Sequence, residues 1–532
     1  MSKLIEYDYV IVGAGSAGCV LANRLSEDPK VKVLLIEAGG SDRNFMIQMP
    51  ATFAMAARNK KFDWGYLSEP EVKCDNRQIL EHRGRVLGGS SSINGMVANR
   101  GNPKDYDDWE RQGLKNWSYA DCLPYFRKME TFDKGPNKWR GGDGPQSIET
   151  AKANHPLDQA FLKAGQQAGY SFTSDQNGET HEGFHIAQSF TRGGQRCSAA
   201  RAYLYPVMNR PNLEVLTNCM VNRIEFDGRR AVRVNTEKNG KVSFFEAGRE
   251  IILCCGAINS PQLLMLSGVG RSTHLRDHDI SCVADVPAVG ENLENHVIAA
   301  IMYGSPPGVS LADQLNGWRK YKVGLQWLLL KNGIGASTLS ETGCFFKSSD
   351  SVDYVDLQHE FYALTSLINE DISNFGGGFM FSMGLMRPLS KGTIRLKSSN
   401  PKAHPELKYN FFSNPIDEKA MIDGLRKTRN MASQTAFDGL RTGETSPGPS
   451  VQSDKEISSW LRANASTEYH PCSTCRMGTS ENSVTDRNGL VHETEGLRVV
   501  DASIMPNNVT ANLNAPVLMI AEKLADTIKG ID

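Results

Sequence analysis

Residues 7–18 read Tyr-Asp-Tyr-Val-Ile-Val-Gly-Ala-Gly-Ser-Ala-Gly and contain the pattern G-x-G-x-x-G at Gly13, Gly15 and Gly18. The apolar, β-branched run at 7–12 is typical of a buried parallel strand, and a helical pattern of apolar residues follows the last glycine. A second apolar strand at 31–36 ends on Glu37. The opening of the chain therefore predicts a strand, a helix and a second parallel strand in succession.

Each glycine of this pattern has a physical role in binding a dinucleotide. Gly13 permits a tight turn, Gly15 lets the backbone approach a pyrophosphate, and Gly18 lets the helix pack closely on the strand. The pyrophosphate then lies on the helix N-terminus. Glu37 follows Gly15 by 22 residues, where a carboxylate can accept hydrogen bonds from an adenosine ribose. The unit indicates a dinucleotide site, but it does not separate FAD from NAD.

Two longer motifs add a family resemblance. Residues 84–96 read Gly-Arg-Val-Leu-Gly-Gly-Ser-Ser-Ser-Ile-Asn-Gly-Met, and residues 256–270 read Gly-Ala-Ile-Asn-Ser-Pro-Gln-Leu-Leu-Met-Leu-Ser-Gly-Val-Gly. They resemble the two signatures of the glucose-methanol-choline (GMC) oxidoreductases, and the similarity continues to residues 499–506. The members that the chain resembles most are choline dehydrogenases and related membrane-associated alcohol dehydrogenases. One departure is Glu294-Asn295-His296, where the family usually has Asp before the histidine. We expect it to affect packing or hydrogen bonding near the flavin rather than the reaction class.

The resemblance implies an α/β fold, in which a Rossmann-type FAD-binding domain is joined to a second, α+β substrate domain. The FAD-binding domain is expected in three segments, 1–155, 205–300 and 455–532. The substrate domain is expected in two, 156–204 and 301–454.

FAD is the cofactor that the resemblance implies. It is expected to be bound non-covalently, because Ile93 stands where some relatives carry a histidine that bonds the flavin. The expected FAD contacts are Gly13, Gly15, Ser16, Ala17, Gly18, Glu37, Ala38, Arg85, Leu87, Gly88, Gly89, Ser90, Asn94, Gly95, Met96, Val97, Val221, Gly256, Ser260, Asp501, Ala502, Asn512 and Pro516.

The expected catalytic pair is His470 and Asn514, which lies 44 residues further on. In the family the matching histidine and asparagine face the flavin. Alcohol oxidation needs a base for the hydroxyl proton while hydride leaves the carbon, and an imidazole with a pKa near ~6.5 is largely a neutral acceptor at pH 7. Asn514 is expected to donate to the substrate oxygen, and the helix that follows it, from Pro516 to 528, is expected to favour negative charge on reduced flavin.

The substrate region is less informative. Glu341, His359 and Tyr469 are the polar candidates, although Glu341 is also compatible with a salt bridge or helix cap and His359 with a place inside a sheet. Choline is the leading substrate, and other aliphatic alcohols, polyols, sugars and aromatic alcohols stay open. A quinone or another carrier is the expected electron acceptor, and oxygen, which would make the protein an oxidase, is the alternative. A lyase or photodecarboxylase variant and a non-catalytic nucleotide-binding protein are the rival functions.

The composition limits the classes of partner that the protein can bind. The 59 basic and 60 acidic residues give a net charge of −1, and this balance argues against nucleic acid. We find neither a signal peptide nor an apolar stretch of 18 residues, so a cytoplasmic location is expected, with peripheral contact at the inner membrane face left open.

The eleven cysteines are expected to be mostly reduced. Cys472 and Cys475 form C-x-x-C, but no second pair completes a zinc set, so buried thiols are expected rather than a metal site.

Overall fold

The first sheet begins with the unit predicted at the N-terminus. In the computed structural model, which describes residues 6–365 and 375–531, β1 (Glu6–Val12) and β2 (Val33–Ile36) pair in parallel and α1 (Ser16–Leu25) joins them. Nearly every side chain of these strands is buried, which explains their continuous apolar sequence. The strand–helix–strand prediction is confirmed.

Later parts of the chain complete this sheet. Its order is β11-β2-β1-β14-β13-β12, with β25 paired to β14. The added strands are β11 (Leu213–Leu216), β12 (Met220–Asp227), β13 (Arg230–Lys238), β14 (Lys241–Leu253) and β25 (Leu497–Val499). The core of the sheet is parallel, and β12, β13 and β14 form an antiparallel extension.

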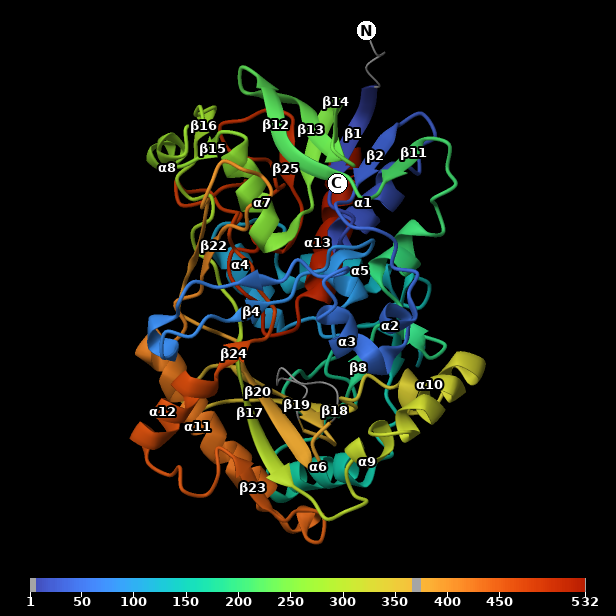
Figure 1. Cartoon of the computed structure of the whole chain (residues 1–532), viewed down its shortest axis with the longest axis vertical. Helices are drawn as coiled ribbons and strands as arrows, with labels where there is room; N and C mark the ends of the chain where they lie inside the picture. The colour runs from blue at the N-terminus through green and yellow to red at the C-terminus, as the bar shows by residue number, and fades with distance from the viewer. Residues whose placement is uncertain (1–5, 366–374, 532) are drawn as a thin grey trace.

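The C-terminal helix returns to the first one. α13 (Asn514–Lys529) packs against α1 and against α5 (Tyr119–Met129), as Figure 1 shows near the middle of the molecule. Arg24 of α1 forms ion pairs with Glu522 and Asp526 of α13. These ion pairs hold the last turn of α1 against α13. The helix predicted after residue 515 is confirmed.

A second sheet forms the other half of the molecule. Its order is β23-β17-β20-β19-β18-β7, with β24 paired to β17, and its pairings are antiparallel. The strands are β7 (Gly183–Ile186), β17 (Val297–Gly304), β18 (Thr342–Phe346), β19 (Leu357–Tyr362), β20 (Phe379–Leu385), β23 (Gly443–Ser446) and β24 (Ser466–Thr467). α6 (Pro156–Gln167) and α11 (Pro415–Ala432) pack on this sheet and on each other.

Shorter elements connect and cover the two sheets. The remaining helices are α2 (Phe45–Gln48), α3 (Phe53–Ala57), α4 (Pro103–Arg111), α7 (Gly256–Leu266), α8 (Ser272–Asp277), α9 (Ala312–Leu315), α10 (Arg319–Leu330) and α12 (Asp454–Asn464). The remaining strands are β3 (Tyr66–Leu67), β4 (Leu80–Glu81), β5 (Glu130–Phe132), β6 (Gln146–Thr150), β8 (Gln188–Ser189), β9 (Thr191–Arg192), β10 (Gln195–Arg196), β15 (Val269–Gly270), β16 (Ala284–Asp285), β21 (Thr393–Arg395) and β22 (Glu406–Lys408).

The two sheets draw on interleaved segments of the chain. Two strands of the second sheet include residues outside the expected substrate segments, because β24 lies in 455–532 and β17 begins at Val297. No helix among residues 6–365 and 375–531 combines the length and apolar character that crossing a bilayer requires.

Candidate active site

One cavity of about 360 Å³ joins the two halves of the molecule. It begins at the turn between β1 and α1 and reaches residues of the second sheet. Val12 and Ile36 of the first sheet line it together with Cys254, which directly follows β14, and the lining residues from the second sheet are Ile298, Glu360, Tyr362, Met380 and Ser382.

The glycine turn closes the first end of this cavity. Gly13 has a positive φ of 98°, and a Cβ there would lie 2.6 Å from the carbonyl oxygen of Cys254. A Cβ on Gly18 would lie 1.9 Å from the carbonyl oxygen of Gly13, whereas the Cβ position on Gly15 has no neighbour nearer than 3.7 Å. The outer two glycines are thus required by packing, and the middle one leaves room beside the helix N-terminus.

Glu37 lies at the end of β2 and lines the cavity. Its carboxylate accepts hydrogen bonds from the backbone N–H of Ala14 at 2.9 Å and of Gly39 at 2.8 Å. Burial raises its pKa to about 7. Each carboxylate oxygen has a second lone pair, so Glu37 can still accept hydrogen bonds from a ribose in the cavity.

The second glycine motif packs directly on the first. Gly88 and Gly89 have positive φ angles of 84° and 53°, and the N–H of Gly88 donates to the carbonyl oxygen of Ala14 at 2.8 Å. A Cβ on Gly89 would lie 2.7 Å from the Cα of Gly15. Two motifs that are about seventy residues apart in sequence therefore form one wall of the cavity.

At the other end, His470 faces a second buried histidine. Its Nδ1 lies 3.0 Å from Nδ1 of His296, and its backbone N–H donates to Oδ1 of Asn295 at 2.9 Å. Burial lowers the pKa of His470 well below 6.5, and the nearby His296 and Arg83 lower it further. Burial likewise lowers the pKa of His296 to about 3. The unusual Asn295-His296 pair is therefore part of the hydrogen bonding around His470.

Two asparagines of the C-terminal motif line the cavity at different places. Nδ2 of Asn512 lies 3.5 Å from Nε2 of His470 and donates to Oε1 of Glu360 at 3.1 Å. Asn514 instead accepts a hydrogen bond from the hydroxyl of Ser16 at 2.7 Å, beside the glycine turn. The structure thus brings Asn512 to His470, although the sequence pointed to Asn514 for that position.

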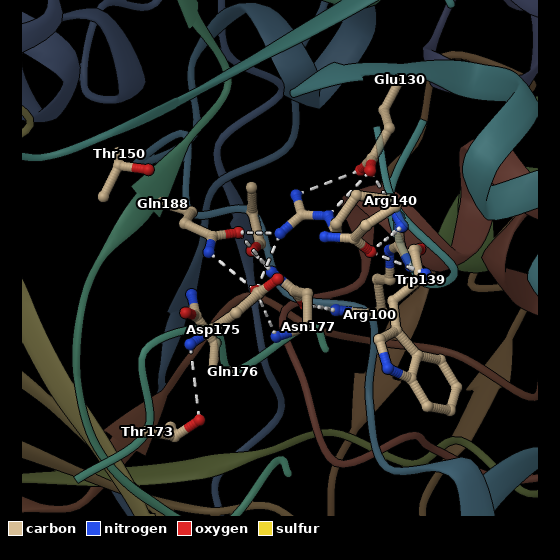
Figure 2. A network of polar contacts seen from close by, with 12 residues as sticks. Arg100, Glu130, Trp139, Arg140, Thr150, Thr173, Asp175, Gln176, Asn177 and Gln188 are labelled. Carbon is tan, nitrogen blue, oxygen red and sulfur yellow. Dashed lines mark hydrogen bonds and ion pairs between the residues drawn. The ribbon is translucent and has the colours of Figure 1, made fainter. Parts of the chain in front are cut away.

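Asn512 is joined through Asn99 to a buried polar network, part of which Figure 2 shows. Oδ1 of Asn512 accepts from Asn99 at 3.0 Å, and Asn99 in turn accepts from Gln176 at 3.3 Å. The neighbouring Asn177 donates to Gln188 at 2.9 Å, and Gln188 also accepts from Arg140 at 2.8 Å. The orientation of the Asn512 amide is thereby set from outside the cavity.

Two carboxyl groups border the cavity beside His470. Oε2 of Glu468 lies 3.7 Å from Nδ1 of both His470 and His296, and the hydroxyl of Tyr362 donates to Glu360 at 2.8 Å. Burial raises the pKa of Glu468 well above its ordinary value, and Glu360 raises it further. Burial also raises the pKa of Glu360. His296, Glu468 and His470 are also the one group among the described residues whose donor atoms lie close enough, within 4.8 Å, to hold a metal ion.

The backbone around His470 is constrained. Tyr469 has a positive φ of 64°, unusual for a residue with a large side chain, and its carbonyl oxygen accepts a hydrogen bond from Arg83 at 2.5 Å. Such conformations persist where surrounding contacts hold them, often at functional sites. Tyr469 lines the cavity, and its role as a substrate contact stays a prediction.

Most of the expected cofactor residues line this cavity. They are Gly13, Gly15, Ser16, Ala17, Glu37, Ala38, Gly89, Ser90, Asn94, Gly95, Met96, Val97, Val221, Gly256, Asp501, Ala502 and Asn512. The other expected residues, which do not line it, are Gly18, Arg85, Leu87, Gly88, Ser260 and Pro516. Ser260, for example, donates at 2.6 Å to Asp501, which also accepts from the N–H of Gly256.

Two of the tentative substrate residues lie away from the cavity. Glu341 accepts hydrogen bonds from the N–H of Ala153 at 2.8 Å and the hydroxyl of Ser337 at 2.7 Å. His359 is fully buried in β19, where its Nε2 lies 2.9 Å from the hydroxyl of Thr428. His359 thus lies inside the sheet, which was the alternative for it, whereas the two hydrogen bonds of Glu341 are neither a salt bridge nor the cap of α6, whose N-cap is His155.

Sequence reasoning missed several residues at the His470 end, above all Glu360, Glu468 and Tyr362. In a strand that is buried along nearly its whole length, the sequence does not show which side chains reach a cavity. The position of Glu360 in β19 could therefore not be predicted from the sequence. Glu468 stands two residues before His470, and this proximity could have drawn attention to it.

The cysteines of the C-x-x-C motif are fully buried free thiols. Burial raises the pKa of Cys472 and of Cys475 well above the ordinary thiol value, which leaves little thiolate for exchange chemistry.

The sequence was compared with models of known protein families. A family model of GMC oxidoreductase matches residues 7–298, and a second GMC oxidoreductase model matches residues 388–521. The chain belongs to the GMC oxidoreductases. The resemblance seen in the sequence and the expected fold class are confirmed.

Similar proteins cover nearly the whole of this GMC oxidoreductase. An oxygen-dependent choline dehydrogenase of Burkholderia multivorans is 46% identical over 530 residues, spanning 99% of this chain and 94% of the relative. Pyridoxine 4-oxidase from Mesorbium loti shares 29% identity with a TM-score of 0.89 over 98% of this chain and 99% of its own. A formate oxidase from Aspergillus oryzae RIB40 shares 28% identity with a TM-score of 0.93 over 100% and 99%. Together with the family, these similarities identify an FAD-dependent alcohol dehydrogenase.

The residues on the cavity wall fit FAD. The packed glycines leave no space for side chains between the two motifs, Gly15 leaves the helix N-terminus open, and the cavity continues without interruption to His470. Glu37 would hold the adenosine end, and the segment 89–97 would line the flavin end.

Proposed function

We propose that this GMC oxidoreductase oxidises a choline-like or other primary alcohol to its aldehyde, with His470 as the base. The observation that carries the proposal is the place of His470, at the end of the same cavity that begins at the dinucleotide turn. Bound FAD supplies the acceptor for the hydride that leaves the alcohol carbon.

The histidine pair sets which nitrogen of His470 can act as the base. Both rings are neutral at pH 7, so only one of the facing Nδ1 atoms carries the proton between them. If His470 donates through Nδ1 to His296, its Nε2 keeps a free lone pair. Nε2 is also the atom nearest the amide nitrogen of Asn512. We infer that Nε2 of His470 takes the hydroxyl proton.

Asn512 is the proposed partner of His470. Its amide nitrogen already lies between His470 and Glu360, and an alcohol oxygen beside Nε2 would come within its reach. A donor in that position steadies the oxygen as its proton leaves and orients the neighbouring C–H bond. Asn514, hydrogen-bonded to Ser16, would instead act at the cofactor side.

Aromatic rings and carboxyl groups support a cationic substrate. Tyr362, Tyr469, Glu360 and Glu468 line the cavity beside His470. A quaternary ammonium group is attracted to aromatic faces and to carboxylates, and its charge would offset the cost of ionising buried acids. The choline dehydrogenase named among the relatives is consistent with such a substrate.

We further propose that FAD is held without a covalent bond. Ile93 lines the cavity in the second glycine motif, and its side chain has no atom that could attack a flavin. The domain division expected from the sequence, with three FAD-binding and two substrate segments, also stands as a proposal. Release of FAD on acid precipitation would support the non-covalent state, and flavin that stays with the precipitate would contradict it.

A quinone or another carrier is the proposed electron acceptor. Because quinones dissolve in lipid, this proposal implies contact with a membrane surface. Oxygen is the second candidate, since the relatives include a protein named as oxygen-dependent and two named as oxidases. Parallel assays of hydrogen peroxide and of quinone or dye reduction separate the two.

Anaerobic mixing with a panel of alcohols tests the function as a whole. We expect choline and related cationic alcohols to bleach the flavin absorbance, with neutral alcohols of the same shape reacting more slowly. A flavin that no primary alcohol reduces would contradict the proposed activity.

A further inference from the structure

Helix α10 exposes an unusual number of large apolar side chains. Trp318, which precedes the helix, and Tyr321 are each 72% exposed, and Leu329 is 70% exposed. Leu325 and Leu328 are also exposed. Contiguous exposed apolar surface on a soluble domain generally marks an interaction site.

These five residues lie on one face of the helix. The spacing from 318 to 321, 325, 328 and 329 follows the turn of an α-helix, so their side chains form a single stripe. We name this stripe the α10 face. Figure 1 shows α10 at the edge of the molecule, projecting away from both sheets.

One residue on the opposite side of the helix anchors it. Trp327 is buried, and its indole N–H donates to the carbonyl oxygen of Gly194 at 2.7 Å. Gly335 allows the close approach, since a Cβ there would lie 2.7 Å from the Cβ of Trp327. The orientation of the helix is therefore fixed with the apolar stripe outward.

The charge around the stripe has one sign. Arg319, Lys320, Lys322 and Lys331 are the charged residues between 318 and 332, so this short segment is strongly basic in a chain whose net charge is −1. The first three are exposed. Basic side chains beside Trp, Tyr and Leu are the pattern of a helix that lies in the headgroup region of a bilayer.

We infer that the α10 face docks on the surface of a membrane that contains anionic lipids. The apolar stripe would enter the boundary between headgroups and acyl chains, while the basic residues would contact lipid phosphates. A second copy of the chain suits this face less well, because a two-fold interface would bring two basic segments together.

The docking face is connected with the substrate end of the cavity. Val323 of α10 packs on a small apolar cluster that includes Tyr362 and Met380, and both of these line the cavity. A membrane-bound enzyme would therefore hold this end of the cavity near the lipid. The inference extends the proposed membrane contact, but it does not depend on which alcohol or acceptor the enzyme uses.

Vesicle sedimentation of the flavin-bound full chain tests the inference. The probes are vesicles of phosphatidylcholine alone and of phosphatidylcholine mixed with phosphatidylglycerol, each at low and high salt. We expect binding to the anionic vesicles, weakened by salt. The variant Leu325→Gln/Leu329→Gln should bind at least about ten-fold more weakly, and Arg319→Gln/Lys322→Gln should lose the preference for anionic lipid.

The matched control is Ile416→Gln, which removes another exposed apolar side chain, from α11 on the other side of Figure 1. It should bind as the parent does. Failure of the parent to bind anionic vesicles at low salt, or unchanged binding of both variants, would overturn the inference. A lipid-free dimer that Leu325→Gln/Leu329→Gln dissociates would assign the face to a second copy instead. Alcohol-dependent flavin reduction, measured on the same samples without lipid, reports the proposed function separately.

Discussion

His470 is surrounded by groups that keep its imidazole neutral. Burial, His296 and Arg83 all lower its pKa, so this imidazole stays unprotonated at a lower pH than a free histidine would. We predict that alcohol-dependent flavin reduction stays constant as pH falls through 6.5 and declines only at lower pH. Stopped-flow measurement of the flavin reduction rate across a pH series tests this. A fall in rate with a midpoint at or above pH 6.5 would contradict it.

Removing the imidazole should affect the reaction more than the fold. We predict that His470→Ala reduces its flavin at least about 100-fold more slowly, because positioned base catalysis contributes about 10² to 10⁴ in rate. The flavin absorbance and thermal unfolding of the variant serve as controls for cofactor binding and folding. Near-normal reduction by the variant would reject His470 as the base.

The two asparagines allow a matched comparison. Asn512 reaches Nε2 of His470, whereas Asn514 bonds to Ser16 at the glycine turn. Loss of one donor to a partly charged oxygen costs about 1.5–3 kcal/mol, so Asn512→Ala should slow flavin reduction by about 10-fold to 100-fold. Asn514→Ala should chiefly weaken FAD retention, measured by dilution or ultrafiltration. The reverse pattern would restore Asn514 as the partner of the base.

At the scale of elements, the contact between the two glycine motifs builds the cofactor wall. Gly89→Ala would place a methyl group 2.7 Å from the Cα of Gly15 and force a side chain into a positive φ. We predict loss of bound FAD, measured by the ratio of flavin to protein absorbance. Gly439→Ala is the control, because Gly439 also has a positive φ, 74°, but has open space around its Cβ position. Retention of FAD by Gly89→Ala at the level of Gly439→Ala would contradict the role of this contact.

Elements were predicted well where the pattern is local. The strands at 7–12 and 31–36 and the helix after residue 515 were recognisable because neighbouring residues alone determine their periodicity. The second sheet was less visible, since β19 and β20 are buried on both faces and show no alternation. For the same reason Glu360, which borders the cavity from β19, was not recognised.

At the scale of the whole molecule, the network in Figure 2 joins distant segments. Arg140 is fully buried and bonds to Glu130 of β5, to Asp175 and to Gln188 of β8. Without Arg140, Glu130 keeps its ion pair with Arg100 at 2.7 Å, but Asp175 loses its cationic partner, and removing one partner of a buried pair costs up to about 3–5 kcal/mol. We predict that Arg140→Met lowers the free energy of unfolding by this amount, as measured by denaturant titration of the flavin-bound protein.

An exposed ion pair nearby provides the control for this prediction. Lys138 and Glu179 lie 3.7 Å apart, and both side chains are largely exposed. Such pairs contribute between about 0 and 1 kcal/mol, so Lys138→Met should change stability little. Similar losses in Arg140→Met and Lys138→Met would show that the buried network does not stabilise the fold.

The amino-acid sequence by itself determined the strand–helix–strand unit with its glycine turn and the family, and it pointed to His470, because short-range spacing and contiguous motifs carry that information. Only the tertiary structure decided which asparagine meets His470, and that His296, 174 residues away, shares a hydrogen bond with it. The reason is physical: residues 512 and 514 lie two apart in the chain, yet at the entry into α13 one side chain contacts His470 and the other contacts Ser16. Distances of a few ångströms between remote segments arise from packing of the whole chain, and no local pattern records them.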